Sequence, residues 1–191
     1  MSETLMIWAT VFLGLFAIIA AVDGFYFHLW KYRLYARAES LYEHQLHTIR
    51  AFLFVPIVFF LFYKNFGGLA LWLGVFFIFL DLIVEIMDVL DENQSRAALG
   101  GLSPVEYLIH ILATMLRTAF IVLALAAKPL SAWNLSSPVI LEEQFSFAEF
   151  AAFTLMPGNI LVGILHLWLM RDKYKSATRF LPVRNCCEFS L

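Results

Sequence analysis

The fold is decided by residues 68–90, which read GLALWLGVFFIFLDLIVEIMDVL. The first thirteen of these residues carry no charge, and acids follow at positions 81, 85 and 88. A helix of this length can cross a bilayer, which requires about 20 mostly apolar residues. Asp81, Glu85 and Asp88 are spaced by four and three residues, so they share one helix face. The stretch therefore predicts a transmembrane helix that carries a stripe of carboxylates near one end.

Four further stretches have the same character, at residues 4–30, 43–63, 104–127 and 148–170. Their apolar runs are too long and too continuous for barrel strands, which alternate over about ten residues. Pro104, directly after Ser103, suits the first turn of a helix. We therefore predict an all-α fold, a polytopic membrane helix bundle with five transmembrane helices. Residues 1–191 form a single domain in this scheme, with residues 171–191 as a tail.

The composition agrees with a membrane protein. Of the 191 residues, 62% are hydrophobic and only 15% are charged, whereas soluble domains contain about 25% charged residues. The net charge is −2, which leaves no basic surplus for the phosphates of a nucleic acid. These figures argue against a soluble enzyme, a disordered protein and a nucleic-acid-binding domain.

Basic residues predict the orientation, because cytoplasmic loops are enriched in Lys and Arg. Nine of them follow the first, third and fifth predicted spans, namely Lys31, Arg33, Arg37, Arg96, Arg171, Lys173, Lys175, Arg179 and Arg184. The loops on the other side hold two, Lys64 and Lys128. We therefore predict that the N-terminus lies outside and that the C-terminus is cytoplasmic.

Ionisable residues inside the spans gather at the ends predicted to face the cytoplasm. Such residues are costly in a membrane and usually functional. All five histidines of the chain fall in this region, and every predicted helix contributes to it. The predicted metal ligands are Asp23, Glu43, His47, Asp81, Glu85, Asp88, Glu106, His110 and His166. His28 and His44 are further candidate ligands, although their positions equally suit contact with lipid head groups.

Three deeper polar residues extend this region. Arg117 follows His110 by seven residues and lies near mid-membrane, so it must face the bundle interior. We expect it to pair with an acid such as Asp81. Residues predicted to contact a substrate or to support the ligands are Arg117, Arg50 and Asn159. In contrast, we expect solvated loop charges at Glu39, Asp91 and Glu92.

Imidazole and carboxylate groups at helical spacing are typical ligands of iron, manganese and zinc. Glu43 and His47 are four residues apart, and so are Glu106 and His110. Soluble di-iron bundles use lone carboxylates from two helices and Glu-x-x-His from two others. The spacing here is one residue longer and further histidines are present, so the likeness concerns the ligand chemistry alone. We therefore predict a dinuclear His/carboxylate site, with iron as first choice and zinc or manganese as second.

The predicted function is that of an integral-membrane metalloenzyme, an oxidoreductase acting on a lipid, a quinone or another apolar substrate in the cytoplasmic leaflet. An electron donor protein could serve as its partner. One alternative is a zinc-dependent membrane hydrolase, in which a zinc-bound water attacks the substrate. Another is a haem-binding subunit, which the many acids disfavour. An ion or proton carrier is disfavoured because the polar residues stop at one leaflet.

Overall fold

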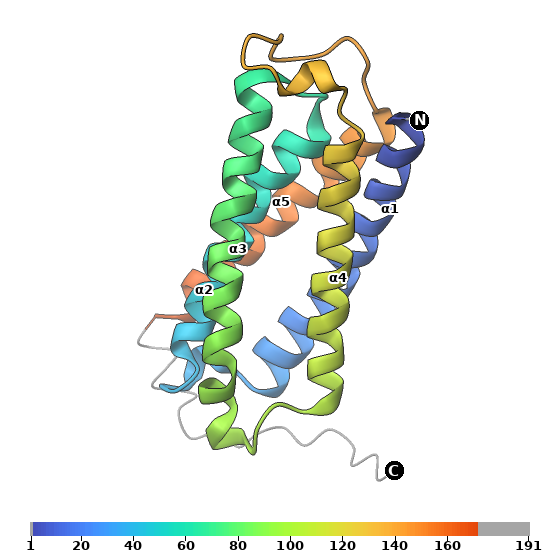
Figure 1. Cartoon of the computed structure of the whole chain (residues 1–191). Coiled ribbons are helices and arrows are strands. Elements are labelled where there is room, and N and C mark those ends of the chain that lie inside the picture. Colours follow the sequence, from blue (N-terminus) through green and yellow to red (C-terminus); the bar gives the residue numbers. More distant parts are fainter. Residues whose placement is uncertain (1, 172–191) are drawn as a thin grey trace.

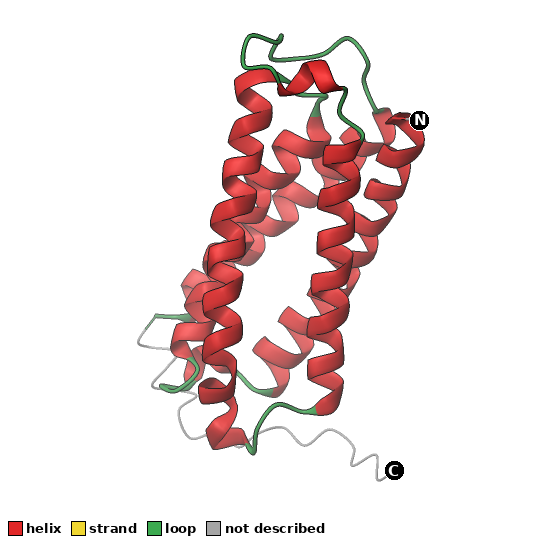
Figure 2. Ribbon diagram, viewed as in Figure 1, coloured by secondary structure: helices red, strands yellow, loops and turns green. Residues whose placement is uncertain are grey.

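The computed structural model describes residues 2–171, and this part of the chain consists of helices and their connections without any strand (Figure 2). Five of its helices are long and apolar enough to cross a membrane. Their bounds are α1 Ser2–Ala21, α2 Leu41–Val58, α3 Gly68–Arg96, α4 Pro104–Ala126 and α5 Ser146–Leu169. The predicted all-α class and the number of candidate spans are confirmed. Residues 172–191, which are most of the predicted tail, lie outside the described part.

Two of the helices continue past their α-helical part as π-helices, in which backbone hydrogen bonds join residues five apart. α1 runs on as η1 (Val22–Lys31), and α2 runs on as η3 (Phe59–Tyr63). A π-helix aligns side chains five residues apart, whereas an α-helix aligns those three or four apart. η1 therefore brings Asp23 and His28 onto one face, and both residues are buried.

The third long helix extends further than predicted. α3 ends at Arg96 rather than at residue 90, and a 3-10 turn, η4 (Ala97–Leu99), follows it. The prediction of solvated loop charges is therefore wrong for Asp91 and Glu92, which lie in this extra length and are half-buried; Glu92 faces α4. Arg96, which the sequence placed in a cytoplasmic loop, is fully buried. The additional turns thus carry charged side chains into the bundle.

The helices form one elongated bundle (Figure 1). α1 packs chiefly against α4, while α2 packs against α3 and α5. The start of α1 and the long connection from α4 to α5 lie at one end, and the connections from α1 to α2 and from α3 to α4 lie at the other. We call the second end the histidine end, because all five histidines lie in the parts of the helices nearest to it.

An apolar core fills the part of the bundle interior that lies away from the histidine end. Phe16, Phe54, Phe62 and Phe120 come from α1, α2, η3 and α4, with contacting ring centroids 5.4–6.3 Å apart. Contacts of this kind add to the burial of their large apolar surfaces. This core joins four helical segments, and the buried charged residues of the described chain, apart from Lys128 at the other end, lie beside it toward the histidine end.

Candidate metal centre

Ionisable side chains from five helical segments meet in the half of the bundle that contains the histidine end. We call them the polar layer. Its members are Asp23, His28, Glu43, His44, His47, Arg50, Asp81, Glu85, Asp88, Glu92, Arg96, Glu106, His110, Arg117 and His166. The structure thus brings the predicted ligands into one region, but it divides them among groups with different partners.

The first group is built around Arg96, at the end of α3. Its guanidinium donates from Nη1 to Glu43 Oε2 at 2.5 Å and from Nη2 to Glu43 Oε1 at 2.9 Å. Nε and Nη2 both donate to Glu106 Oε1, at 2.9 and 2.6 Å. Glu106 is held in place because Ser103 caps α4 and accepts a hydrogen bond from the Glu106 backbone N–H. Arg96 therefore pairs with two of the predicted metal ligands.

A second group lies deeper in the bundle, around Arg117 and Arg50. Arg117 donates to Asp81 Oδ2 and to Glu85 Oε2, so the predicted Arg117–Asp81 pair is confirmed. Arg50 donates to Asp88 Oδ2 at 3.1 Å, and its Nη2 lies 3.4 Å from Glu85 Oε1. Charged groups inside a membrane normally pair with one another. The carboxylate stripe of α3 is therefore largely neutralised by arginines from α2 and α4.

A third group consists of Asp23, His28 and His110. Asp23 Oδ1 lies 3.1 Å from His110 Nε2 and 3.5 Å from His28 Nε2. Within residues 2–171, no arginine forms an ion pair with this carboxylate. One candidate ligand atom from each of the three residues lies within 4.8 Å of the other two, so the group could hold a metal ion. Two imidazoles and one carboxylate are also the ligands of many non-haem iron sites.

His28 belongs to a second possible ligand group, together with Glu43 and His47. Glu43 Oε1 lies 3.6 Å from His47 Nε2 and 3.8 Å from His28 Nε2. His47 Nε2 is also 3.4 Å from Asp88 Oδ1, a buried atom that makes no hydrogen bond within the described residues. Because Glu43 already accepts two hydrogen bonds from Arg96, it offers a cation less uncompensated charge than Asp23 does.

The His110 ring is held between two carboxylates. Its Nε2 faces Asp23, and its Nδ1 faces Glu92 Oε1 of α3. A carboxylate on the far nitrogen of a metal-binding histidine orients the ring and raises its basicity. Glu92 is therefore placed to position His110 toward Asp23 and His28.

With its histidines counted as neutral, the polar layer contains more negative than positive side chains. It has three arginines, which pair with five of its acids. It has seven carboxylates, those of Asp23, Glu43, Asp81, Glu85, Asp88, Glu92 and Glu106, which exceeds the number of arginines by four. In addition, His28 is 1% exposed and neither of its ring nitrogens has a hydrogen-bond partner within the described residues. Buried carboxylates in excess beside unpartnered imidazole nitrogens create an environment that favours a cation.

His44 and His166 form a separate pair. Their rings stack with centroids 4.5 Å apart and an interplanar angle of 22°. His44 Nε2 lies 3.3 Å from the His166 backbone carbonyl oxygen, to which it can donate. Neither residue belongs to a possible metal-ligand group found in residues 2–171. The structure therefore brings these two predicted ligands to each other rather than to His28.

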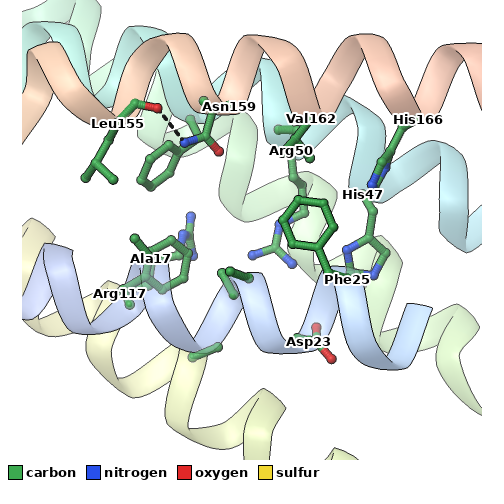
Figure 3. A pocket seen from close by; sticks show the side chains of 18 of the residues that line it. Ala17, Asp23, Phe25, His47, Arg50, Arg117, Leu155, Asn159, Val162 and His166 are labelled. Atoms are coloured by element: carbon green, nitrogen blue, oxygen red, sulfur yellow. Dashed lines mark hydrogen bonds between the residues drawn. The ribbon is translucent and has the colours of Figure 1, made fainter. Parts of the chain in front are cut away.

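Two cavities adjoin these groups. The main cavity has a volume of about 280 Å³ and is lined by Asp23, His47, Arg50, Asn159 and His166 among others (Figure 3). The second cavity, of about 70 Å³, lies among the carboxylates and histidines of η1, α2, α3 and α4. It has room for about two groups the size of a water molecule. Asn159 donates its side-chain amide to the carbonyl of the preceding helical turn at 3.0 Å, so it is a wall residue of the main cavity.

Sequence reasoning undervalued His28 and missed the roles of Glu92 and Arg96. His28 is five residues from Asp23, a spacing that only the π-helical geometry of η1 aligns. For the other two, a signal was present: the stripe of Asp81, Glu85 and Asp88 continues with a spacing of four residues to Glu92 and then Arg96. Following that stripe past residue 90 would have extended α3 and identified both residues.

Comparison with known proteins did not add a relative. A scan against protein-family models, a search of curated proteins and a search of solved structures each found no match.

Proposed function

We propose that this chain is an integral-membrane metalloenzyme whose metal centre is bound by Asp23, His28 and His110. The observation that carries the proposal is the convergence of these three side chains within a buried excess of carboxylates. Asp23 is the acid of the polar layer that combines two histidine neighbours with no arginine partner among the described residues. A cation in this position offsets charge that the arginines leave uncompensated.

A second ion position is proposed at His47, whose Nε2 lies between Glu43 Oε1 and Asp88 Oδ1. The polar layer has four more carboxylates than arginines. Two divalent cations would supply four positive charges and balance this excess. The second cavity, which both positions border, has the size that two small groups require. These features support a dinuclear centre.

Iron is the metal we propose first, because two imidazoles and one carboxylate are typical ligands of non-haem iron in oxygenases. Iron would make the chain an oxidoreductase, with an electron donor protein as its partner. Zinc or manganese is the second choice, and zinc would support hydrolysis by activating a bound water. The protein contributes the orientation of the ligands and a dry surrounding. The main cavity beside the centre supports a membrane-dissolved substrate, a lipid or a quinone-like molecule.

The apolar core argues for a site rather than a conduction path. Phe54, Phe62 and Phe120 pack together in the interior beyond the polar layer. A carrier needs polar groups along its whole route, since ions and protons are costly in an apolar interior. The carboxylates, histidines and arginines of the polar layer lie on one side of this core, where a bound metal could use them, while the buried charge on the other side is that of Lys128.

We also propose that the histidine end faces the cytoplasm. Lys31, Arg33, Arg37 and Arg171 lie at this end, while Lys64 and Lys128 lie at the other. Cytoplasmic segments are enriched in such residues. Arg96 no longer contributes to this comparison, because it is buried among carboxylates. In this orientation a cytosolic reductant can reach the metal centre.

Metal analysis of the purified chain, combined with its absorption spectrum, tests the proposed centre. We expect iron in the wild-type protein and its loss in His28→Phe, with the helical content unchanged by circular dichroism. Glu92→Gln should weaken metal binding about 10- to 100-fold, because it removes the carboxylate that positions His110. His44→Phe removes an equally buried histidine and serves as the control that retains the metal. Wild-type protein that stays metal-free after loading with iron, manganese and zinc contradicts the proposal.

A further inference from the structure

The main cavity extends along two helical segments. It is lined on one side by residues 16–25 of α1 and η1, and on the other by residues 154–166 of α5. At 1.5 Å per residue these segments extend about 14 and 18 Å. A volume of about 280 Å³ holds about nine groups the size of a water molecule or a methylene. The length and the volume both suit a single unbranched chain of about nine carbon atoms.

This cavity opens between the first helix and α5. Its exposed lining residues are Ala21 and Phe25 on one side and Thr154 and Gly158 on the other. The lining residues from α2, α3 and α4 are buried or half-buried. A Cβ atom added at Gly158 meets nothing within 4 Å, so the space beside this residue is open. The opening lies along the apolar length of two candidate spans, where a membrane lipid can enter.

His166 lines the histidine end of the cavity and carries an unpartnered acceptor. The Thr48 hydroxyl donates its hydrogen to the His44 carbonyl oxygen at 2.7 Å. Thr48 Oγ1 can therefore only accept from His166 Nδ1, which lies 3.5 Å away. With the proton on Nδ1, Nε2 of His166 is unprotonated, and this buried atom makes no hydrogen bond within the described residues. A ligand in the cavity can satisfy it only by donating a hydrogen bond.

We infer that the main cavity binds a single-chain lipid with a neutral hydroxyl head group, as in a fatty alcohol, which donates a hydrogen bond to His166 Nε2. The head group then lies at the end where Figure 3 shows His166, His47 and Phe25 together, and the chain extends toward Ala17 and Leu155. The inference deepens the proposed function, on which it rests for the role of His47 as a metal ligand beside the head group.

The surroundings disfavour two other classes of ligand. The carbonyl oxygens of a quinone only accept hydrogen bonds, so a quinone leaves His166 Nε2 unsatisfied. A fatty acid carboxylate needs a free cation, but Arg50 and Arg117, which line the cavity, already pair with acids of α3. A neutral hydroxyl meets neither difficulty.

Photolabelling of the full chain in lipid nanodiscs tests the inference. The two probes are decanol with a diazirine in mid-chain and the methyl ether of the same molecule, which has no hydrogen-bond donor. We expect the alcohol to label residues within 16–25 and 154–166. The ether should bind about ten-fold more weakly, the usual effect of one unsatisfied buried hydrogen-bonding group.

Three variants locate the binding site. His166→Phe keeps the ring stacked on His44 but removes the acceptor, so the alcohol should bind no better than the ether. Gly158→Phe fills the opening and should reduce labelling by both probes. Gly14→Phe is the matched control, because its added side chain also meets nothing within 4 Å at the Cβ and Gly14 does not line the cavity.

Equal labelling by the alcohol and the ether in the wild-type protein overturns the inference, as does full labelling of Gly158→Phe. Loss of metal in His166→Phe also overturns it, because His166 is then a metal ligand. Metal content is measured in the same preparations. Specific alcohol labelling of metal-free protein supports the cavity and contradicts the metal centre, whereas bound metal without alcohol labelling supports the centre and overturns the cavity inference.

Discussion

Replacing Arg96 with methionine tests whether the buried ion cluster at the end of α3 holds the bundle together. The guanidinium is 0% exposed and donates four hydrogen bonds to Glu43 and Glu106 and one to Ser95. Methionine keeps much of the apolar length of the side chain but supplies neither charge nor donors. The two carboxylates are too deeply buried for water to take over these hydrogen bonds.

The size of the effect follows from the number of acids that Arg96 serves. Removing one partner of a buried ion pair costs about 3–5 kcal/mol, because the other charge stays buried and uncompensated. Removing Arg96 leaves two such charges. We therefore expect the free energy of unfolding to fall by an amount near the upper end of this range, about 5 kcal/mol. Adding Glu43→Gln and Glu106→Gln removes both charges, and this triple variant should recover more than half of the lost stability.

Equilibrium unfolding in mixed detergent micelles, followed by circular dichroism, measures this difference. A chelator in every sample removes the contribution of bound metal, which would otherwise stabilise the folded state. Arg171→Met is the control, because Arg171 is exposed and a surface change should stay within about 0.5 kcal/mol. An Arg96→Met variant within about 1 kcal/mol of wild type would refute the buried cluster.

Two further predictions concern the opposite end of the bundle and the orientation. Burial lowers the pKa of Lys128, which donates to Asn65 Oδ1 at 2.9 Å, from 10.5 to about 8. Between these values the unfolded chain binds the proton and the folded chain does not, so stability should rise with pH from about 8 to 10.5. Thermal unfolding should show this rise in wild type and a flatter profile in Lys128→Met. Reporter fusions at the two termini should report opposite sides of the membrane, and a shared side would contradict five spans.

The sequence alone determined the features that depend on local composition and helical periodicity. Uninterrupted apolar stretches predicted the five candidate spans, because the length of a membrane helix follows from the thickness of the bilayer. The pairing of Arg117 with Asp81 was also predictable. A buried cation needs an acid at similar depth, and depth can be counted along each helix at a constant rise.

Only the tertiary structure decided which acids are neutralised and which are left for a cation. Counting along the chain gives the depth of a residue, but the rotation of each helix and the choice of neighbouring helix depend on packing. Arg96 forms ion pairs with Glu43 and Glu106 because α3 continues past its apolar stretch and directs this guanidinium inward. Asp23 therefore contacts histidines and forms no ion pair with an arginine among the described residues.

The role of His28 had the same origin in backbone geometry. If η1 were α-helical, Asp23 and His28 would lie on different faces. Its π-helical hydrogen bonds place both on one face, with Asp23 Oδ1 3.5 Å from His28 Nε2. Such a change in helix type follows from the contacts of a segment rather than from its hydropathy. The sequence therefore determined where polar groups enter the membrane, and the packed helices decided which of them meet, because a meeting depends on helix rotation and neighbours.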